Sequence, residues 1–282
     1  MATIPHPTLF IGAGNMAQAI ISGASSAQVL DPDAVAVLDP DPSRHHFFNH
    51  PFTDPAQAFA WLVSQTTWAE PVSTIVLAVK PQMLEPAIAP LRPLLSTLPA
   101  KPLVISILAG SRIAQIEQAF KNQARVIRVM PNTPAQIGLG MSAIAVSASA
   151  TESDLALTTQ LFSSVGQTIT IAESLIDAYT ALAGSGPAYL FYLAESMVHA
   201  AEELGFNPDQ AQLIVRQTLL GSATLLAQST ESPSALRRRV TSKAGTTEAA
   251  TDILDKSGVM DTIIRAIRAA QARGVELGQS KP

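Results

Sequence analysis

The stretch Leu9-Phe10-Ile11-Gly12-Ala13-Gly14-Asn15-Met16-Ala17 decides the fold of this chain. An apolar run leads into a G-x-G-x-x-A turn, and a helical pattern follows. In a nucleotide-binding β-α-β unit, Gly12 permits the tight turn, Gly14 lets a pyrophosphate approach the backbone, and Ala17 lets the helix touch the strand. The free N–H groups at the start of the helix also attract phosphate. The alternative is close packing alone. The residues predicted to bind a dinucleotide here are Gly12, Gly14, Asn15 and Met16.

Four further apolar, β-branched runs follow in the first half of the chain, at residues 34–38, 74–79, 103–107 and 126–130. Their near-continuous apolar character is typical of strands covered on both faces, and the helical stretches between them supply the crossovers that a parallel sheet requires. The pattern predicts an α/β fold with a doubly wound, Rossmann-type parallel sheet. Two shorter runs, at residues 142–146 and 168–171, extend this predicted sheet.

The strand signal ends near residue 177, and helical spacing continues to about residue 277. We therefore predict two domains, a dinucleotide-binding domain over residues 1–172 and an all-helical domain over residues 173–282. The second domain is rich in alanine and poor in charge, so a monomer would leave apolar helix faces uncovered. This predicts a homodimer or higher homo-oligomer that forms through the helical domain.

The composition excludes several classes of function. The chain has 282 residues, a formal net charge of −4 and no cysteine. The negative balance disfavours a nucleic-acid partner, and without Cys ligands or a histidine pattern we expect no metal site. The charge-free stretches are broken by Pro, Gly, Asn and Ser, unlike a membrane span. Residues 1–7 also lack a secretory pattern, so we expect a cytoplasmic protein with no membrane partner.

Two signals about the cofactor conflict at the end of the second predicted strand. Asp39 could accept hydrogen bonds from the adenosine ribose, which favours NAD, whereas Ser43 and Arg44 could hold a 2′-phosphate, which favours NADP. Asp39 could instead cap the short helix that Pro42 begins. We expect NADPH or NADH as the cofactor, with NADPH slightly preferred.

The nicotinamide end of the site is predicted at the carboxyl ends of later strands, where ligands bind in open α/β sheets. The residues predicted there are Ala78, Val79, Lys80, Pro81 and Asn132. Asn132 lies in a polar corner between two prolines. The alternatives are a solvated strand end at Lys80 and a plain proline-stiffened turn at Asn132.

Taken together, these motifs resemble the pyrroline-5-carboxylate reductase family. The matching pieces occur in family order and cover residues 8 to about 270. The most specific is the block Ala181-Leu182-Ala183-Gly184-Ser185-Gly186-Pro187-Ala188-Tyr189. The other pieces are Gly12-Ala13-Gly14-Asn15-Met16 and the ranges 78–81, 130–135, 138–141 and 241–247.

The resemblance implies NAD(P)H-dependent reduction of the imine of 1-pyrroline-5-carboxylate to L-proline, the last step of proline biosynthesis, by a dimer or larger assembly. It implies that Thr247 is catalytic, its hydroxyl facing the ring nitrogen, and that Gly245 and Thr246 offer backbone N–H groups to the substrate. Ser185 and Gly186 start a long helix, and because they are small the substrate ring or a second subunit's loop could come close to them; the alternative is a helix start with tight packing. Without the resemblance, Thr246 and Thr247 would be read as an ordinary helix cap.

The chain departs from the family pattern at two places, and two other functions are open. The family usually has Ser-Pro-Gly-Gly-Thr-Thr where this chain has Ser242-Lys243-Ala244-Gly245-Thr246-Thr247, and the stretch at residues 55–68 is longer than the family norm. The altered loop favours a non-catalytic dinucleotide-binding protein. A related Rossmann reductase for another small substrate would generally need a lysine in residues 187–204, where this chain has none.

Overall fold

The computed structural model describes residues 6–66 and 73–279, so the end of the long stretch at residues 55–68 lies outside the described residues. Chain contacts divide the protein into two compact units. The first unit comprises Met1–Gly184 and Ala270–Pro282, and the second comprises Ser185–Ala269.

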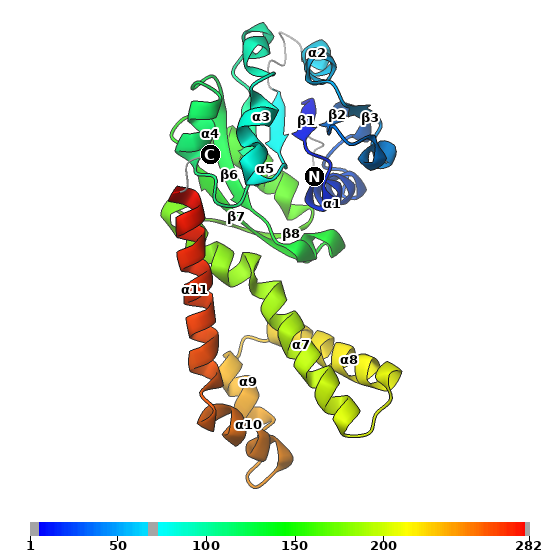
Figure 1. Cartoon of the computed structure of the whole chain (residues 1–282), viewed down its shortest axis with the longest axis vertical. Helices are drawn as coiled ribbons and strands as arrows, with labels where there is room; N and C mark the ends of the chain where they lie inside the picture. Colours follow the sequence, from blue (N-terminus) through cyan, green and yellow to red (C-terminus); the bar gives the residue numbers. More distant parts are fainter. Residues whose placement is uncertain (1–5, 67–72, 280–282) are drawn as a thin grey trace. The chain divides into compact units, whose positions relative to one another are not determined.

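Within the described residues, eight strands of the first unit form one sheet, in the order β3-β2-β1-β4-β5-β6-β7-β8 (Figure 1). The strands are β1 (Thr8–Ile11), β2 (Val35–Leu38), β3 (His50–Phe52), β4 (Thr74–Leu77), β5 (Leu103–Ser106), β6 (Arg125–Met130), β7 (Gly140–Val146) and β8 (Gly166–Thr170). Neighbouring strands pair in parallel except β6 and β7, which are antiparallel. The doubly wound Rossmann-type sheet is confirmed, with this one reversal. Its cause is the short connection after β6, which holds only one 3-10 turn and is too short for a parallel crossover.

Strand β3 was missing from the sequence prediction. It is short, and Pro51 lies inside it, paired with Val37 of β2. Proline has no N–H to donate, so it is tolerated where one side of a strand is unpaired, as at this edge of the sheet.

Two layers of helices cover the sheet. Helices α1 (Asn15–Ser26) and α5 (Glu152–Ser163) pack on one face, where Ile20 and Phe162 belong to one buried cluster. Helices α2 (Pro55–Gln65), α3 (Leu84–Ile88) and α4 (Ile113–Ala119) contribute Phe59, Ile88 and Ile116 to the cluster on the other face. Burial on both faces explains why the central strands are apolar at nearly every position.

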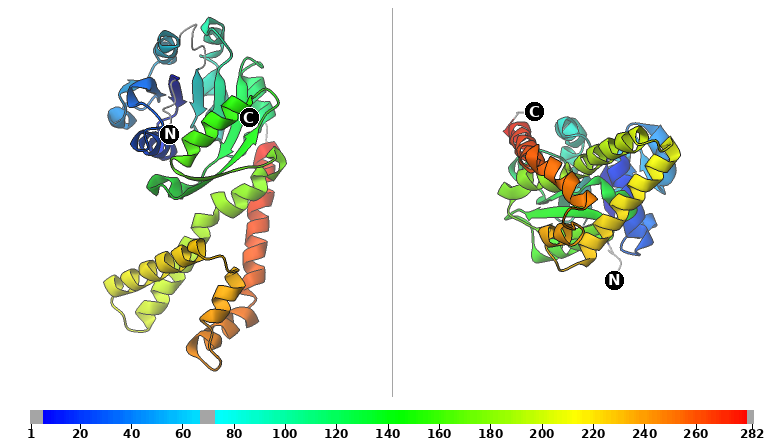
Figure 2. Two further views of the ribbon diagram at one scale, coloured as in Figure 1. Left: turned by 180° about the vertical axis from the view of Figure 1, so that it is seen from behind. Right: turned by 90° about the horizontal axis from the view of Figure 1, so that it is seen from below.

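The second unit is helical, as predicted. It contains α7 (Gly186–Glu203), α8 (Pro208–Gln228), α9 (Pro233–Arg239), α10 (Thr246–Lys256) and the first part of α11 (Val259–Gln279). Helices α7 and α8 lie side by side in Figures 1 and 2. Large apolar side chains of both helices are exposed, including Phe191 at 68%, Tyr192 at 73% and Leu213 at 69%. The described helices include none that combines the length and apolar character needed to cross a bilayer.

The last turns of α11 belong to the first unit, where they pack on the turn before α4. A Cβ atom built on Gly110 would lie 3.4 Å from the Leu277 Cβ, and one built on Gly278 would lie 3.2 Å from the Gly110 carbonyl oxygen. Gln115 Nε2 donates a hydrogen bond of 3.4 Å to the Gly278 carbonyl. The contact at Gly278 is tight, so glycine there lets the helix approach the turn closely, whereas at Gly110 it is the left-handed backbone, with φ +76°, that favours glycine.

Candidate functional site

The glycine turn lies at the carboxyl edge of the central strands. Gly12 has φ +104°, and a Cβ atom there would lie 2.7 Å from the Ala78 carbonyl oxygen at the end of β4. The Gly12 N–H donates to the Leu38 carbonyl at 2.8 Å, and the Ala78 N–H donates to the Ile11 carbonyl at 2.8 Å. The ends of β1, β2 and β4 thus meet at Gly12, and only glycine can occupy this position without strain.

The next glycine serves a different purpose. Gly14 has an ordinary extended backbone, φ −70° and ψ 173°, so its conformation does not require glycine. A Cβ atom at Gly14 would meet no atom of the described protein within 4 Å, so it would point into open space. Gly14 is also the N-cap of α1 and makes no side-chain cap, which leaves the first N–H groups of the helix available to an anion. Exposed Asn15 and half-buried Met16 follow. These features fit a pyrophosphate of a dinucleotide.

Asp39 joins the end of β2 to this turn. Its carboxylate is buried, accepts the Ala13 N–H at 2.8 Å through Oδ2, and accepts the Asp41 N–H at 3.0 Å through Oδ1. The alternative that Asp39 caps the following helix is wrong. The cap is Asp41, which accepts the Ser43 N–H at 3.0 Å.

Asp41 also holds the side chains that were predicted to bind a 2′-phosphate. Ser43 Oγ donates to Asp41 Oδ1 at 2.7 Å, and Arg44 Nε lies 3.3 Å from Asp41 Oδ2. Arg44 Nη1 lies 3.7 Å from Asp39 Oδ2. The sequence analysis missed Asp41, although the same Asp-Pro pattern caps two other helices, at Asp31 and Asp54, and could have revealed it.

The predicted nicotinamide end combines a strand end and a braced corner. After β4, Ala78 and Val79 are half-buried, and exposed Lys80 precedes a 3-10 turn that Pro81 begins. Asn132 follows β6. Its Oδ1 accepts the Met141 N–H at 2.9 Å, and its Nδ2 donates to the Ala183 carbonyl at 3.0 Å.

A half-buried tyrosine also braces this corner. Tyr179 donates from its hydroxyl to the Met141 carbonyl at 2.6 Å, and burial raises the pKa of this phenol to about 12. The amide of Asn132 and the phenol of Tyr179 therefore hold the chain just before Ser185. Each uses its polar end for the structure of the first unit, a role that the sequence did not indicate.

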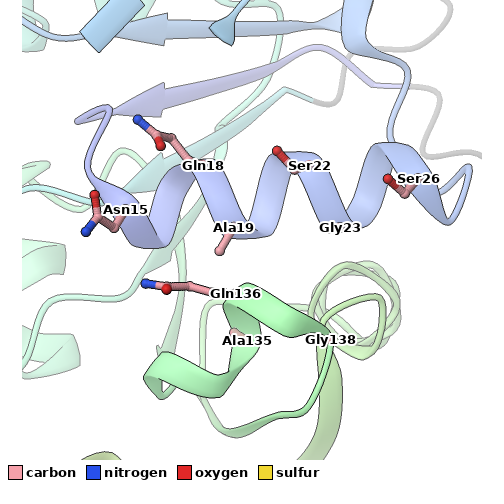
Figure 3. Close-up of a pocket in the computed structure, with 9 residues that line it drawn as sticks. All are labelled: Asn15, Gln18, Ala19, Ser22, Gly23, Ser26, Ala135, Gln136 and Gly138. Carbon is pink, nitrogen blue, oxygen red and sulfur yellow. The ribbon is translucent and has the colours of Figure 1, made fainter. Parts of the chain in front are cut away.

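A polar groove of about 420 Å³ begins at Asn15, the first residue of α1, and runs along this helix, opposite the turn after β6 (Figure 3). Figure 3 shows Asn15 and Gln136 at the same end of this groove. Its lining is Asn15, Gln18, Ala19, Ser22, Gly23, Ser26, Ala135, Gln136 and Gly138. None of these side chains titrates near neutral pH, so the groove supplies no acid or base of its own.

In the second unit, the predicted substrate loop forms a tight turn into α10. A Cβ atom on Gly245 would lie 2.9 Å from the Ser242 carbonyl oxygen, and Ala244 has φ +56°. The Ala244 N–H donates to Glu248 Oε2 at 2.6 Å. Ala244 thus keeps the left-handed backbone at a position where the family usually has glycine, at a cost of about 1 kcal/mol. The altered loop therefore still makes a glycine-like turn.

The start of α10 is open to a ligand. Its N-cap is Gly245, with no side-chain cap, so the alternative in which Thr246 or Thr247 caps the helix is not what the structure has. The helix N–H groups are free to meet a carboxylate. Ser185 and Gly186 begin α7 without a side-chain cap, but the π-helical segment Thr180–Gly184 leads directly into them, so this helix start is not open like that of α10. A Cβ atom on Gly186 would meet no described atom within 4 Å. Among the residues that the structure describes, no group of three or more His, Asp or Glu side chains could hold a metal ion.

Comparison with known proteins adds a full-length relationship to this geometry. Residues 173–277 match the family model "Pyrroline-5-carboxylate reductase dimerisation", and residues 8–110 match "NADP oxidoreductase coenzyme F420-dependent". The chain is 36% identical over 272 residues to a pyrroline-5-carboxylate reductase of Synechocystis sp., covering 95% of this chain and 97% of that protein. It is 34% identical over 270 residues to pyrroline-5-carboxylate reductase 1 of Bacillus subtilis, covering 96% and 89%.

Solved structures match this chain over almost its whole length. A pyrroline-5-carboxylate reductase from Coxiella burnetii superposes with a TM-score of 0.85 at 32% identity, covering 98% of this chain and all of that one. The Plasmodium falciparum pyrroline carboxylate reductase, solved with NADP bound, shares the fold with a TM-score of 0.85 at 24% identity, covering 99% and 100%. On this sequence identity and coverage, the chain belongs to the pyrroline-5-carboxylate reductase family.

Proposed function

We propose that this chain reduces 1-pyrroline-5-carboxylate to L-proline with NADPH or NADH. The observation that carries the proposal is the relationship to reductases of this name at up to 36% identity over 95% of the chain. The uncapped helix start at Gly14, with open space where a Cβ would lie, supports the dinucleotide part of the site.

In this proposal the first unit binds the cofactor, which supplies a hydride to the imine carbon when bound. The N–H groups at the start of α1 bind the pyrophosphate, and the strand ends at Ala78–Pro81 and Asn132 face the nicotinamide end. NADPH is slightly preferred because Ser43 and Arg44, at the carboxyl end of β2 where the adenosine ribose binds in this fold, can share with a 2′-phosphate the contacts that they make with Asp41.

The second unit contributes the substrate site. The open start of α10, at Gly245 and Thr246, binds the substrate carboxylate, and the Thr247 hydroxyl hydrogen-bonds the ring nitrogen, which gains a proton as the carbon gains the hydride. Ser185 and Gly186 leave room beside the ring. No strong acid is needed, because a protonated imine is already electrophilic, so the protein acts by positioning.

A second copy of the chain is part of the proposed enzyme. The exposed apolar side chains of α7 and α8, such as Phe191 and Leu213, suit a partner's helices, and the family model matched here describes dimerisation. We propose a homodimer or a higher homo-oligomer. Light scattering on the purified protein measures its mass directly, and a monomer would contradict this part.

The test of the activity is to mix purified protein with 1-pyrroline-5-carboxylate and NADPH, and separately NADH, and to measure L-proline. Proline formation supports the proposal. Dinucleotide binding without proline formation would instead favour a different substrate or a non-catalytic role.

A further inference from the structure

We propose that Asp41 is a specificity-determining residue that weakens NADPH binding relative to NADH. It does so by occupying Ser43 and Arg44 and by placing a second negative charge where the 2′-phosphate would lie. The inference rests on the proposed function, because it takes the glycine turn as the dinucleotide site.

The groups suited to a 2′-phosphate already have a partner. Asp41 Oδ1 accepts both the Ser43 N–H at 3.0 Å and the Ser43 hydroxyl at 2.7 Å. Asp41 Oδ2 lies 3.3 Å from Arg44 Nε. To bind a phosphate, the hydroxyl and the guanidinium must give up or share these contacts with Asp41.

The local charge also opposes a phosphate. Asp39 and Asp41 both lie within ion-pair distance of the single Arg44 guanidinium, at 3.7 and 3.3 Å, so two negative charges face one positive charge. The hydrogen bonds from Ser43 lower the pKa of Asp41, so its carboxyl is ionised at neutral pH. The neighbouring His45 Nε2 donates to the Asp39 backbone carbonyl at 2.8 Å and does not touch either carboxylate. NADH has a neutral hydroxyl where NADPH has a phosphate, so this cost falls on NADPH alone.

The two carboxylates differ in what else they do. Asp39 is buried and fixes the glycine turn through the Ala13 N–H, so replacing it would disturb binding of either dinucleotide. Asp41 is about half exposed, and the side chains that it binds, Ser43 and Arg44, belong to the short turn that it caps, so its charge can be removed without disturbing the glycine turn. In Asp41→Asn the amide oxygen can still accept the Ser43 N–H, and asparagine is as good a helix cap as aspartate.

The chain offers a matched control. Asp31 also precedes a proline, is exposed, and caps a short turn by accepting the Asp33 N–H at 3.0 Å. It comes before β2, at the opposite end of the strand from Asp41. Asp31→Asn therefore removes the same charge from the same motif, away from the proposed phosphate position.

The experiment measures the dissociation constants of NADPH and NADH by titration calorimetry, for the wild type, Asp41→Asn and Asp31→Asn. For Asp41→Asn we expect NADPH to bind about fivefold more tightly at low salt, with a smaller gain at high salt and NADH affinity unchanged. Asp31→Asn should alter neither constant.

The outcomes separate the two proposals. If the wild type binds both dinucleotides and Asp41→Asn shifts them equally or not at all, the role of Asp41 is overturned and the proposed function stands. The role is also overturned if Asp31→Asn gives the same gain. If the wild type binds neither dinucleotide, the proposed function fails, and the role of Asp41 fails with it.

Discussion

Alanine substitutions at the two glycines of the turn should have different effects, one on the stability of the fold and the other on dinucleotide binding. In Gly12→Ala the new methyl group would lie 2.7 Å from the Ala78 carbonyl oxygen, on a backbone with φ +104°. In Gly14→Ala the methyl group would meet no described protein atom within 4 Å, on a backbone that alanine adopts readily. We expect the first variant to lose stability and the second to lose dinucleotide affinity.

The size of each effect follows from these contacts. For Gly12→Ala, the left-handed backbone costs about 1–2 kcal/mol and the overpacking against β4 about 1–3 kcal/mol, so the free energy of unfolding should fall by about 2–5 kcal/mol. For a chain of this size that lowers the melting temperature by roughly 5–15 °C. For Gly14→Ala, the melting temperature should stay the same or rise slightly, because alanine reduces the entropy of the unfolded chain.

Gly14→Ala should weaken dinucleotide binding. Its methyl group would occupy space that a pyrophosphate needs, and a steric cost of about 2 kcal/mol corresponds to roughly 30-fold weaker binding. Thermal denaturation without ligand and calorimetric titration with NADPH and NADH measure the two effects independently. Unchanged affinity of Gly14→Ala for both dinucleotides would refute the assignment of the turn, and an unchanged melting temperature of Gly12→Ala would refute the tight contact with β4.

Three further predictions concern other parts of the chain. Thr247→Ala should lower turnover more than about tenfold with little change in dinucleotide affinity, because a hydrogen bond to a charged group is worth about 1.5–3 kcal/mol. Thr247→Ser, which keeps the hydroxyl, should retain activity, and steady-state kinetics with a binding titration compare the two; equal loss in both variants would argue against the hydroxyl. Ala244→Gly should raise the free energy of unfolding by up to about 1 kcal/mol in thermal denaturation, since glycine relieves the left-handed strain; a lower melting temperature would contradict this. Asp154→Asn should lower the free energy of unfolding by about 2–3 kcal/mol at neutral pH, because buried Asp154 pairs with Arg125 at 2.8 Å. Burial opposes ionisation of Asp154, but hydrogen bonds from Arg125 and Thr151 outweigh it and lower its pKa below 3.8. The carboxylate therefore stabilises the fold at neutral pH, and the difference from wild type should shrink as the pH falls below about 4; a difference that persisted in acid denaturation would be evidence against the pair.

The sheet was predictable because strands that are buried on both faces have a recognisable sequence pattern, a short run of apolar residues. Strands β1, β2, β4, β5 and β6 read as short apolar runs, since each is covered by helices on either side. The edge strand β3 does not have this pattern, because Pro51 and its two half-buried neighbours do not form an apolar run. The antiparallel direction of β7 cannot be predicted from the residues of β7 either. It follows from the short connection between β6 and β7.

The sequence motifs indicated where the candidate site lies along the chain, but not which contacts its residues make. The spacing of Gly12 and Gly14 indicated the turn, but only the structure assigns close packing to the first and open space to the second. Asp39 is predicted to face a ligand, and the structure adds that each of its carboxylate oxygens also accepts a backbone N–H group. Which partner a polar side chain selects depends on three-dimensional neighbours such as Ala13, 26 residues away in the chain.

The final turns of α11 have a consequence for how the protein is made. They complete the first unit at Gly110 and Gln115, yet the ribosome adds them only after the whole of the second unit. At about 5–20 residues per second, the turn before α4 stays uncovered for several seconds while Ser185–Ala269 emerges. The first unit therefore gains its last packing contacts, those of the final turns of α11, only after the whole of the second unit has been synthesised.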